Sequence, residues 1–170
     1  MKSVLIVIAL FVGVALYSCG GGSSSDNSNG SEAVSNAGKS PAMMENSKSA
    51  VDVDAPSKSK GVGKFTDVKV PSGIDAKMAA KGQEVFNTKC TACHQATDQK
   101  LIGPGLKGIT KIRTPEWIMN MITNPDQMTQ QDPVAEALLV QFNHTQMTNQ
   151  GLTDEEAREV LEFFRQNDAK

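Results

Sequence analysis

Aromatic residues and long hydrophobic stretches are both scarce in this sequence. Phe, Trp and Tyr make up 5% of the 170 residues, with a single Trp and a single Tyr. A folded domain with so few large side chains builds only a modest hydrophobic core of its own. The longest apolar stretch, residues 4–16, has 13 residues, whereas a transmembrane helix needs about 20. The formal net charge of −2 gives no bulk attraction to nucleic acid or anionic lipid, so we expect no nucleic-acid partner.

The first 18 residues have the features of a bacterial export signal. Lys2 supplies a positive charge before the short apolar stretch, which is the usual order in a signal peptide. The stretch ends at Leu16-Tyr17-Ser18-Cys19, which resembles the lipobox of bacterial lipoproteins. That resemblance implies cleavage before Cys19, a diacylglycerol on its thiol and stable anchoring by several acyl chains. The alternative is an ordinary signal peptide with a chance cysteine.

Residues 19–65 contain few apolar side chains. Gly, Ser, Asn, Ala and Lys dominate from Gly20 to Lys64, and five lysines are balanced by five acidic residues. Such a segment cannot bury enough apolar surface to offset the entropy lost on ordering. We therefore expect a flexible tether with a root-mean-square reach on the order of 35–40 Å. The predicted organisation is a signal peptide at 1–18, a lipidated Cys19 with a linker to residue 65, and one folded domain at 66–170.

The sequence of residues 66–170 predicts an all-α domain of about four helices. Residues 75–89 carry apolar side chains at helical spacing. Thr114-Pro115 and Asp132-Pro133 each combine a capping residue with a proline in the first turn. Asn124-Pro125 is expected to end the helix that starts at Thr114. Thr153 and Glu156 form a capping box before the last helix, and no segment alternates convincingly as a strand.

The five residues Cys90-Thr91-Ala92-Cys93-His94 predict covalent attachment of haem. Two thiols spaced three residues apart can reach the two vinyl groups of a haem, and the adjacent His94 then binds the iron. A redox dithiol would be expected near a βαβ pattern, which this sequence lacks. A zinc site would need two further ligands, and the only other histidine is His144, so zinc fits the motif less well. One buried haem would also supply the apolar mass that the small core lacks.

Residues 66–170 resemble a class I c-type cytochrome domain. Gly82 and Phe86 match the Gly-x-x-x-aromatic pattern of that family's first helix, which crosses the last helix where Phe163 or Phe164 packs. Gly103-Pro104-Gly105-Leu106 resembles the family's Gly-Pro-x-Leu loop. The resemblance implies that the backbone carbonyl of Pro104 accepts a hydrogen bond from His94. Arg113 and Trp117 are candidates for contacts with the haem propionates, by loose analogy with the family.

The second axial ligand of the iron decides between electron transfer and catalysis. The family resemblance implies a methionine just before the last helix, and Met147 matches this position, although Thr148 follows it where the family usually has proline. His144 lies in the same stretch and is the main competitor. The remaining candidates are Met119, Met121 and Met128. With His94 and Met147 both on the iron, no open position would remain for an external ligand.

The predicted function is one-electron transport by a lipid-anchored cytochrome in a bacterial respiratory chain, with the haem domain in the periplasm or at the cell surface. We expect a membrane electron donor and, as acceptor, a periplasmic or membrane-bound reductase or oxidase, with nitrous-oxide reductase as one example. The basic excess in residues 69–113, eight against three acidic residues, predicts steering of an acidic partner. The alternatives are a haem enzyme or gas sensor with an open sixth site, and a fixed subunit of a respiratory complex.

Overall fold

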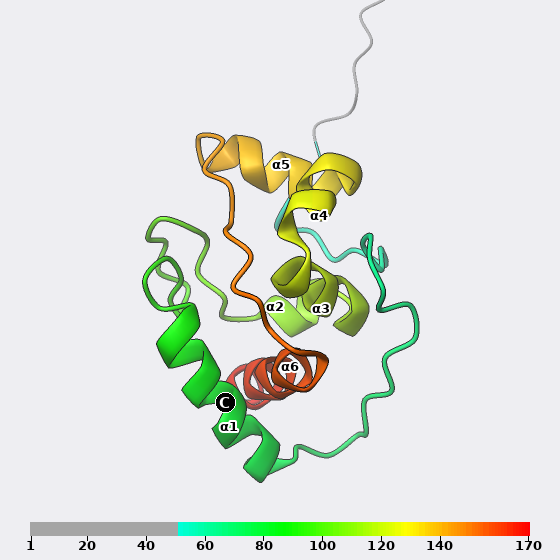
Figure 1. Cartoon of the computed structure of the whole chain (residues 1–170), viewed down its shortest axis with the longest axis vertical. Helices are drawn as coiled ribbons and strands as arrows, with labels where there is room; N and C mark the ends of the chain where they lie inside the picture. Colours follow the sequence, from blue (N-terminus) through cyan, green and yellow to red (C-terminus); the bar gives the residue numbers. More distant parts are fainter. Residues whose placement is uncertain (1–50) are drawn as a thin grey trace, which may run out of the picture. The chain divides into compact units, whose positions relative to one another are not determined.

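The computed structural model describes residues 51–170, so the predicted export signal, Cys19 and most of the predicted linker lie outside the described residues. Every regular element in residues 51–170 is a helix, as Figure 1 shows. The helices are α1 (Ala76–Lys89), α2 (Ile109–Ile112), α3 (Pro115–Thr123), α4 (Pro125–Gln131), α5 (Pro133–Gln141) and α6 (Asp154–Asp168). None of them is both long enough and apolar enough to cross a membrane. The predicted all-α class is therefore confirmed.

The predicted starts of four helices are confirmed, and residues 51–170 contain two further helices that the sequence did not predict. Asp75, Thr114, Asp132 and Thr153 each cap a helix N-terminus through their side chains. Asn124-Pro125 ends α3 as expected, yet Pro125 also occupies the first turn of α4. A proline in the first turn is compatible with a helix because that turn's N–H groups have no helical partner. The other additional helix, α2, has only four residues, which is too short to produce a periodic apolar pattern.

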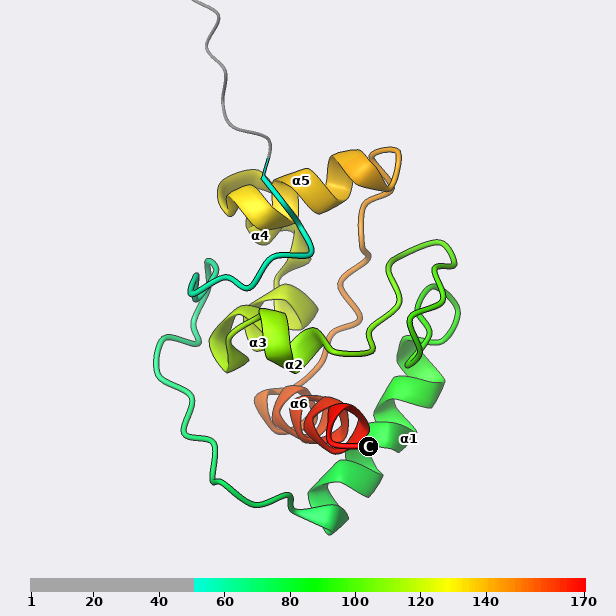
Figure 2. The same cartoon turned by 180° about the vertical axis from the view of Figure 1, so that it is seen from behind.

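Helices α1 and α6 cross at Gly82, where their backbones approach closely. A Cβ atom at Gly82 would lie 1.9 Å from the carbonyl oxygen of Glu159, so no larger residue fits without moving α6. Phe86, one turn further along α1, packs against both Phe163 and Phe164, with ring centroids 5.2 and 5.7 Å apart. The crossing is visible in Figures 1 and 2. The expected packing of an α6 aromatic against α1 therefore involves both phenylalanines.

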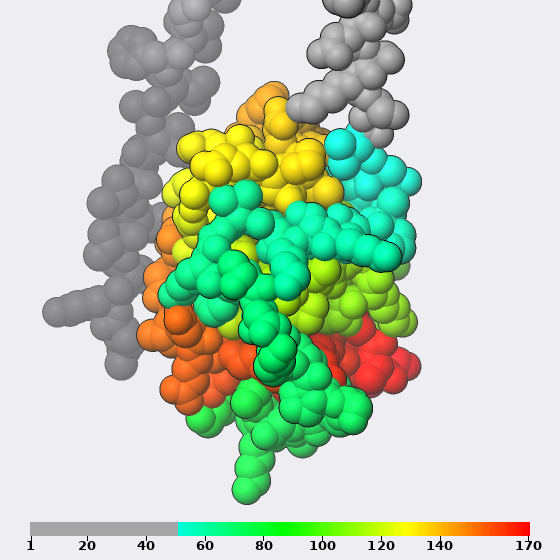
Figure 3. Space-filling model, turned by 90° about the vertical axis from the view of Figure 1, so that its right-hand side faces the viewer, coloured from blue at the N-terminus to red at the C-terminus, as the bar shows by residue number. Residues whose placement is uncertain are grey.

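An extended segment, residues 51–70, runs along the outside of the helices and is called the strap below. Figure 2 follows it from its start beside α4 and α5 past α3 towards the start of α1, and Figure 3 shows its atoms lying across this face. Burial alternates along its first part, with Val51, Val53 and Ala55 partly buried and the residues between them exposed. The sequence predicts a flexible linker up to residue 65, whereas residues 51–65 pack on the domain.

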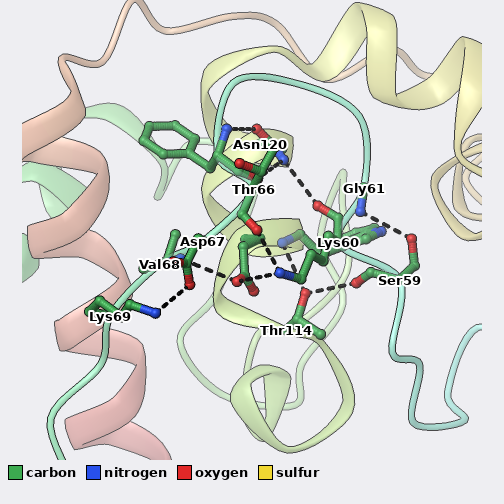
Figure 4. A network of polar contacts seen from close by, with 12 residues as sticks. Ser59, Lys60, Gly61, Thr66, Asp67, Val68, Lys69, Thr114 and Asn120 are labelled. Atoms are coloured by element: carbon green, nitrogen blue, oxygen red, sulfur yellow. Dashed lines mark hydrogen bonds and ion pairs between the residues drawn. The ribbon is translucent and has the colours of Figure 1, made fainter.

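Helix α3 holds the strap through side chains that bond to the strap backbone. The Asn120 side chain donates to the carbonyls of Lys60 and Phe65 at 3.0 and 2.9 Å and accepts from the Phe65 N–H at 3.0 Å. Thr114 donates to the carbonyl of Ser59 at 2.7 Å, and Glu116 accepts from the N–H of Val68 at 3.2 Å. Figure 4 shows this network. These bonds satisfy several backbone groups of a segment that pairs with no strand within residues 51–170.

Arg113, just before α3, fixes the first part of the strap. Its guanidinium donates to the carbonyls of Val53 and Ala55, the latter at 2.8 Å. The guanidinium also lies over the indole ring of Trp117, with 5.3 Å between its carbon and the ring centroid. The side chain is only 4% exposed, so these backbone carbonyls replace water as its hydrogen-bond acceptors.

Candidate functional site

A cavity of about 340 Å³ opens between the segment after α1 and the segment before α6. Its walls are mostly apolar and come from α1, α3, α5 and α6, and include Phe86, Trp117, Ile118, Leu138, Leu139 and Phe164. Cys90, Cys93, His94, Pro104 and Met147 all line this cavity. The fold therefore gathers in one place the five residues that the sequence singles out for cofactor binding.

The cysteines and His94 reach the cavity because the chain turns tightly where α1 ends. The N–H of Cys90 bonds to the carbonyl of Phe86 at 2.9 Å, and the carbonyl of Cys90 accepts from Cys93 and His94 at 3.1 and 2.9 Å. Burial raises the pKa of the Cys90 thiol to about 11, and the charge of Lys89 lowers it less. Redox dithiols need a lowered thiol pKa, so this environment argues against the dithiol interpretation.

The imidazole of His94 is oriented by the Gly103-Pro104 loop. Its Nδ1 lies 2.9 Å from the carbonyl oxygen of Pro104, and because a carbonyl only accepts, Nδ1 must carry the proton. The Nε2 lone pair is then available to a metal ion. A Cβ atom at Gly103 would lie 2.4 Å from the ring carbon Cε1, so only glycine permits this close approach. The loop therefore sets both the tautomer and the position of the ring.

The candidates for the second axial ligand are separated by the structure. Met147 is partly buried and lines the cavity, whereas His144 is exposed and lies outside the lining. Met121 also lines the cavity from α3. Met119 and Met128 are 3% and 0% exposed and belong to the core, where the sulfur of Met128 accepts a hydrogen bond from the strap. Met147 and Met121 are therefore the two thioethers at the cavity.

The loop that carries Met147 is held by polar contacts on both sides of it. The Thr129 hydroxyl donates to the side-chain oxygen of Gln146 at 3.0 Å, and Asn149 donates to the carbonyl of Thr123 at 2.9 Å. The capping box between Thr153 and Glu156 follows, with distances of 2.8 and 3.1 Å. These contacts restrain the loop without the proline that the family usually has after its methionine.

Arg113 and Trp117 are not placed as the resemblance implied for propionate contacts. Arg113 does not line the cavity, and its guanidinium donates to the strap carbonyls of Val53 and Ala55. Trp117 does line the cavity, but its indole N–H donates to Asp132 at 3.0 Å. Sequence reasoning identified Asp132 only as a helix cap, because nothing in its local sequence points to Trp117.

The residues at the cavity fit a covalently bound haem. Two thiols and one imidazole stand at a single turn, and the Pro104 carbonyl already orients the His94 ring through Nδ1. The surrounding walls are apolar, as the face of a porphyrin requires, and a thioether is available from the loop before α6. Within residues 51–170 no group of three or more His, Cys, Asp or Glu side chains could hold a metal ion directly.

Comparison with known proteins agrees with a haem site in this cavity. A family model described as "Cytochrome c" matches residues 79–168. Cytochrome c from Rhodothermus marinus is 42% identical over 63% of this chain and 90% of its own, with a TM-score of 0.61. An engineered form of that protein bound to a carbene intermediate is 40% identical over 64% of this chain and 92% of its own, with a TM-score of 0.59. No curated protein matches.

Proposed function

The chain belongs to the cytochrome c family, and on this premise we propose that it is a mono-haem electron carrier of a respiratory chain, tethered to a membrane by a lipid. One haem c is attached covalently through Cys90 and Cys93, as in the family. Haem supplies a one-electron couple between ferric and ferrous iron. The observation that carries the proposal is that one apolar cavity holds both Met147 and the oriented His94 in its lining.

In this proposal His94 and Met147 are the two axial ligands. The Pro104 carbonyl keeps the proton on Nδ1 of His94, so that Nε2 would be the atom that binds the haem iron. The thioether of Met147 favours the ferrous state and gives a higher midpoint potential than a second histidine would. With both positions held by the chain, one-electron transfer would be the chemistry left to the haem, and on this ground we infer a carrier rather than an enzyme.

Two other functions fit the same family and are distinguished by simple observations. A haem enzyme or gas sensor needs an open sixth position, so its reduced form would bind carbon monoxide without any substitution. A fixed subunit of a respiratory complex would copurify with its partners in stoichiometric amounts. The polar composition of residues 19–50 favours the tethered carrier, because a flexible connection raises the effective concentration near membrane partners.

Cytochrome c domains are typically exported, and the lipid anchor on Cys19 is the testable part of the proposed location. In a bacterial host that exports and matures cytochromes, we expect the full chain in the membrane fraction and Cys19→Ser in the soluble fraction, both carrying haem. Haem staining of the two fractions after denaturing electrophoresis measures this. Equal amounts of both chains in the membrane fraction would contradict the anchor.

We further propose that redox partners dock at an apolar rim around the mouth of the cavity. Leu101, Ile102 and Val140 are 50%, 53% and 56% exposed. Ile102 and Phe142 also line the cavity, and Lys100 lies over the Phe142 ring at 5.9 Å from its centroid. The expected partners remain a membrane donor and a reductase or oxidase as acceptor.

The lysines of α1 offer less free charge for steering than the sequence suggests. Lys81 pairs with Glu159 at 3.1 Å, and Lys89 pairs with Glu156 at 3.1 Å. Lys107, in the loop before α2, donates to the carbonyl of Asn167. Part of the positive charge in residues 69–113 is therefore offset by α6 within the same molecule. These contacts favour docking of partners through the apolar rim, with only modest electrostatic steering.

The rim is tested by the rate at which membrane vesicles from the producing bacterium oxidise the reduced protein. We expect Ile102→Ser to slow this oxidation several-fold, because it removes apolar contact area at the cavity mouth. Ile74→Ser is the matched control, since Ile74 is 38% exposed but does not line the cavity. The rate should change little between ~0.01 and ~0.15 M ionic strength. A steep fall with salt together with an unaffected Ile102→Ser variant would contradict apolar docking.

A further inference from the structure

A buried carboxylate, Asp132, lies behind the wall of the haem cavity. Its side chain is 2% exposed, which is rare for an aspartate without a cationic partner. Within residues 51–170 Asp132 forms no ion pair. Its oxygens instead accept hydrogen bonds from four neutral groups, the Trp117 indole N–H at 3.0 Å, the Ser59 hydroxyl at 2.8 Å, and the N–H groups of Val134 and Ala135 at 3.0 and 2.9 Å.

These bonds connect Asp132 to two walls of the cavity and to the strap. Trp117 and Ala135 both line the cavity, and each donates directly to Asp132. As the N-cap of α5, Asp132 also fixes the start of the helix that brings Leu138 and Leu139 to the cavity. Ser59, the fourth donor, belongs to the strap and does not line the cavity. The carboxylate is therefore one residue removed from the haem cavity.

Trp117 is held between two opposite charges. Asp132 accepts from its indole N–H, and the guanidinium of Arg113 lies over its ring face. Arg113 is not bonded to Asp132 and gives its hydrogen bonds to backbone carbonyls. Arg113 and Asp132 attract each other through space, but no cation contacts the carboxylate, whose negative charge is spread over four hydrogen bonds.

We propose that Asp132 is a positioning residue that holds Trp117 and α5 against the haem, and that its buried charge lowers the haem midpoint potential. This inference rests on the proposed haem electron carrier. Ferric haem carries one more positive charge than ferrous haem, so a nearby anion stabilises the ferric form more. The effect is large only where water is excluded, because charges interact more strongly in a medium of low dielectric constant. A carboxylate that is 2% exposed meets this condition.

The test compares midpoint potentials of the full-length haem protein with those of Asp132→Asn and Asp126→Asn. Asparagine keeps an oxygen for the Trp117 N–H and is itself a good N-cap, so Asp132→Asn removes the charge with little change in shape. We expect it to raise the midpoint potential. Asp126 is exposed on α4, and Asp126→Asn, with the same change in net charge, should raise it much less. Equal shifts in both variants, or no shift in Asp132→Asn, would overturn the proposal.

A second comparison separates the charge of Asp132 from its structural role. Ser59→Ala removes one hydrogen-bond donor from the carboxylate without touching the cavity wall. We expect it to change the midpoint potential in the wild-type background and to have no effect in the Asp132→Asn background. The same shift in both backgrounds would overturn the proposal. Near-ultraviolet circular dichroism of Trp117, the only tryptophan, should change in Asp132→Ala and be retained in Asp132→Asn.

If the proposed carrier function is wrong, the spectrum of the wild type shows it independently of any effect of Asp132. The sulfur-to-iron charge-transfer band of the ferric protein reports axial methionine, and it should be present in the wild type and in Asp132→Asn. A missing band in the wild type contradicts the proposed ligation, whatever the potential of the variant. A retained band with no shift in Asp132→Asn contradicts only the role of Asp132.

Discussion

Replacing Met147 by alanine should abolish the sulfur-to-iron charge-transfer band, lower the midpoint potential and open the iron to carbon monoxide. Met147 lines the haem cavity, and its thioether favours the ferrous state, so its loss favours the ferric state. Axial ligands move haem potentials over a range of about 0.8 V, and we expect the shift to take a substantial part of that range. Absorption spectra of the oxidised and reduced protein, with and without carbon monoxide, measure the charge-transfer band and the binding of carbon monoxide. A redox titration measures the midpoint potential.

The matched control is His144→Ala in the same loop. His144 is exposed and does not line the cavity, so this variant should keep the band, the potential and the resistance to carbon monoxide. Met121→Ala is a second control, because Met121 is the other thioether at the cavity. A band that persists in Met147→Ala but disappears in Met121→Ala or His144→Ala would refute our assignment. Binding of carbon monoxide by the reduced wild type would favour the gas sensor or enzyme.

Features set by local sequence were predictable. A capping side chain followed by proline marks the starts of α3 and α5, because both effects act within one turn of helix. The attachment motif could be identified for the same reason, since five consecutive residues carry all of its chemistry. Local sequence put Met147 and His144 in the same loop as competing ligands. Only the packing of that loop against α4 separates them, with Met147 at the cavity and His144 outside it.

Features set by distant residues were not predictable in the same way. The strap is polar enough to resemble a linker, and what orders it is a set of side chains on α3 and Arg113, far along the chain. The alternation of Val51, Val53 and Ala55 with acidic residues and proline was an available signal, because it matches an extended segment with one side buried. No comparable signal marks Asp132, whose bond to Trp117 depends on how α3 and α5 pack.

Removal of both attachment thiols should leave a chain that holds no haem covalently and is largely unfolded. Several core residues, among them Phe86, Val160 and Phe164, line the haem cavity, so the haem forms part of the core. An empty apolar cavity of 340 Å³ at ~24 cal/mol per Å³ destabilises a protein by about 8 kcal/mol. The total stability of a small domain is about 5–15 kcal/mol. Loss of the haem would therefore remove about half or more of the free energy of unfolding.

The double variant Cys90→Ala/Cys93→Ala tests this dependence. We expect no haem stain after denaturing electrophoresis and a far-ultraviolet circular dichroism signal well below that of the wild type. Thr91→Ala is the matched control, since Thr91 is exposed within the same motif and bonds only to the carbonyl of Asn87. That variant should keep the haem and the helices. Wild-type helix content in a haem-free double variant would show that the modest core suffices alone. The helices would then form before the haem is attached, and a core with few aromatic side chains would be stable without the cofactor.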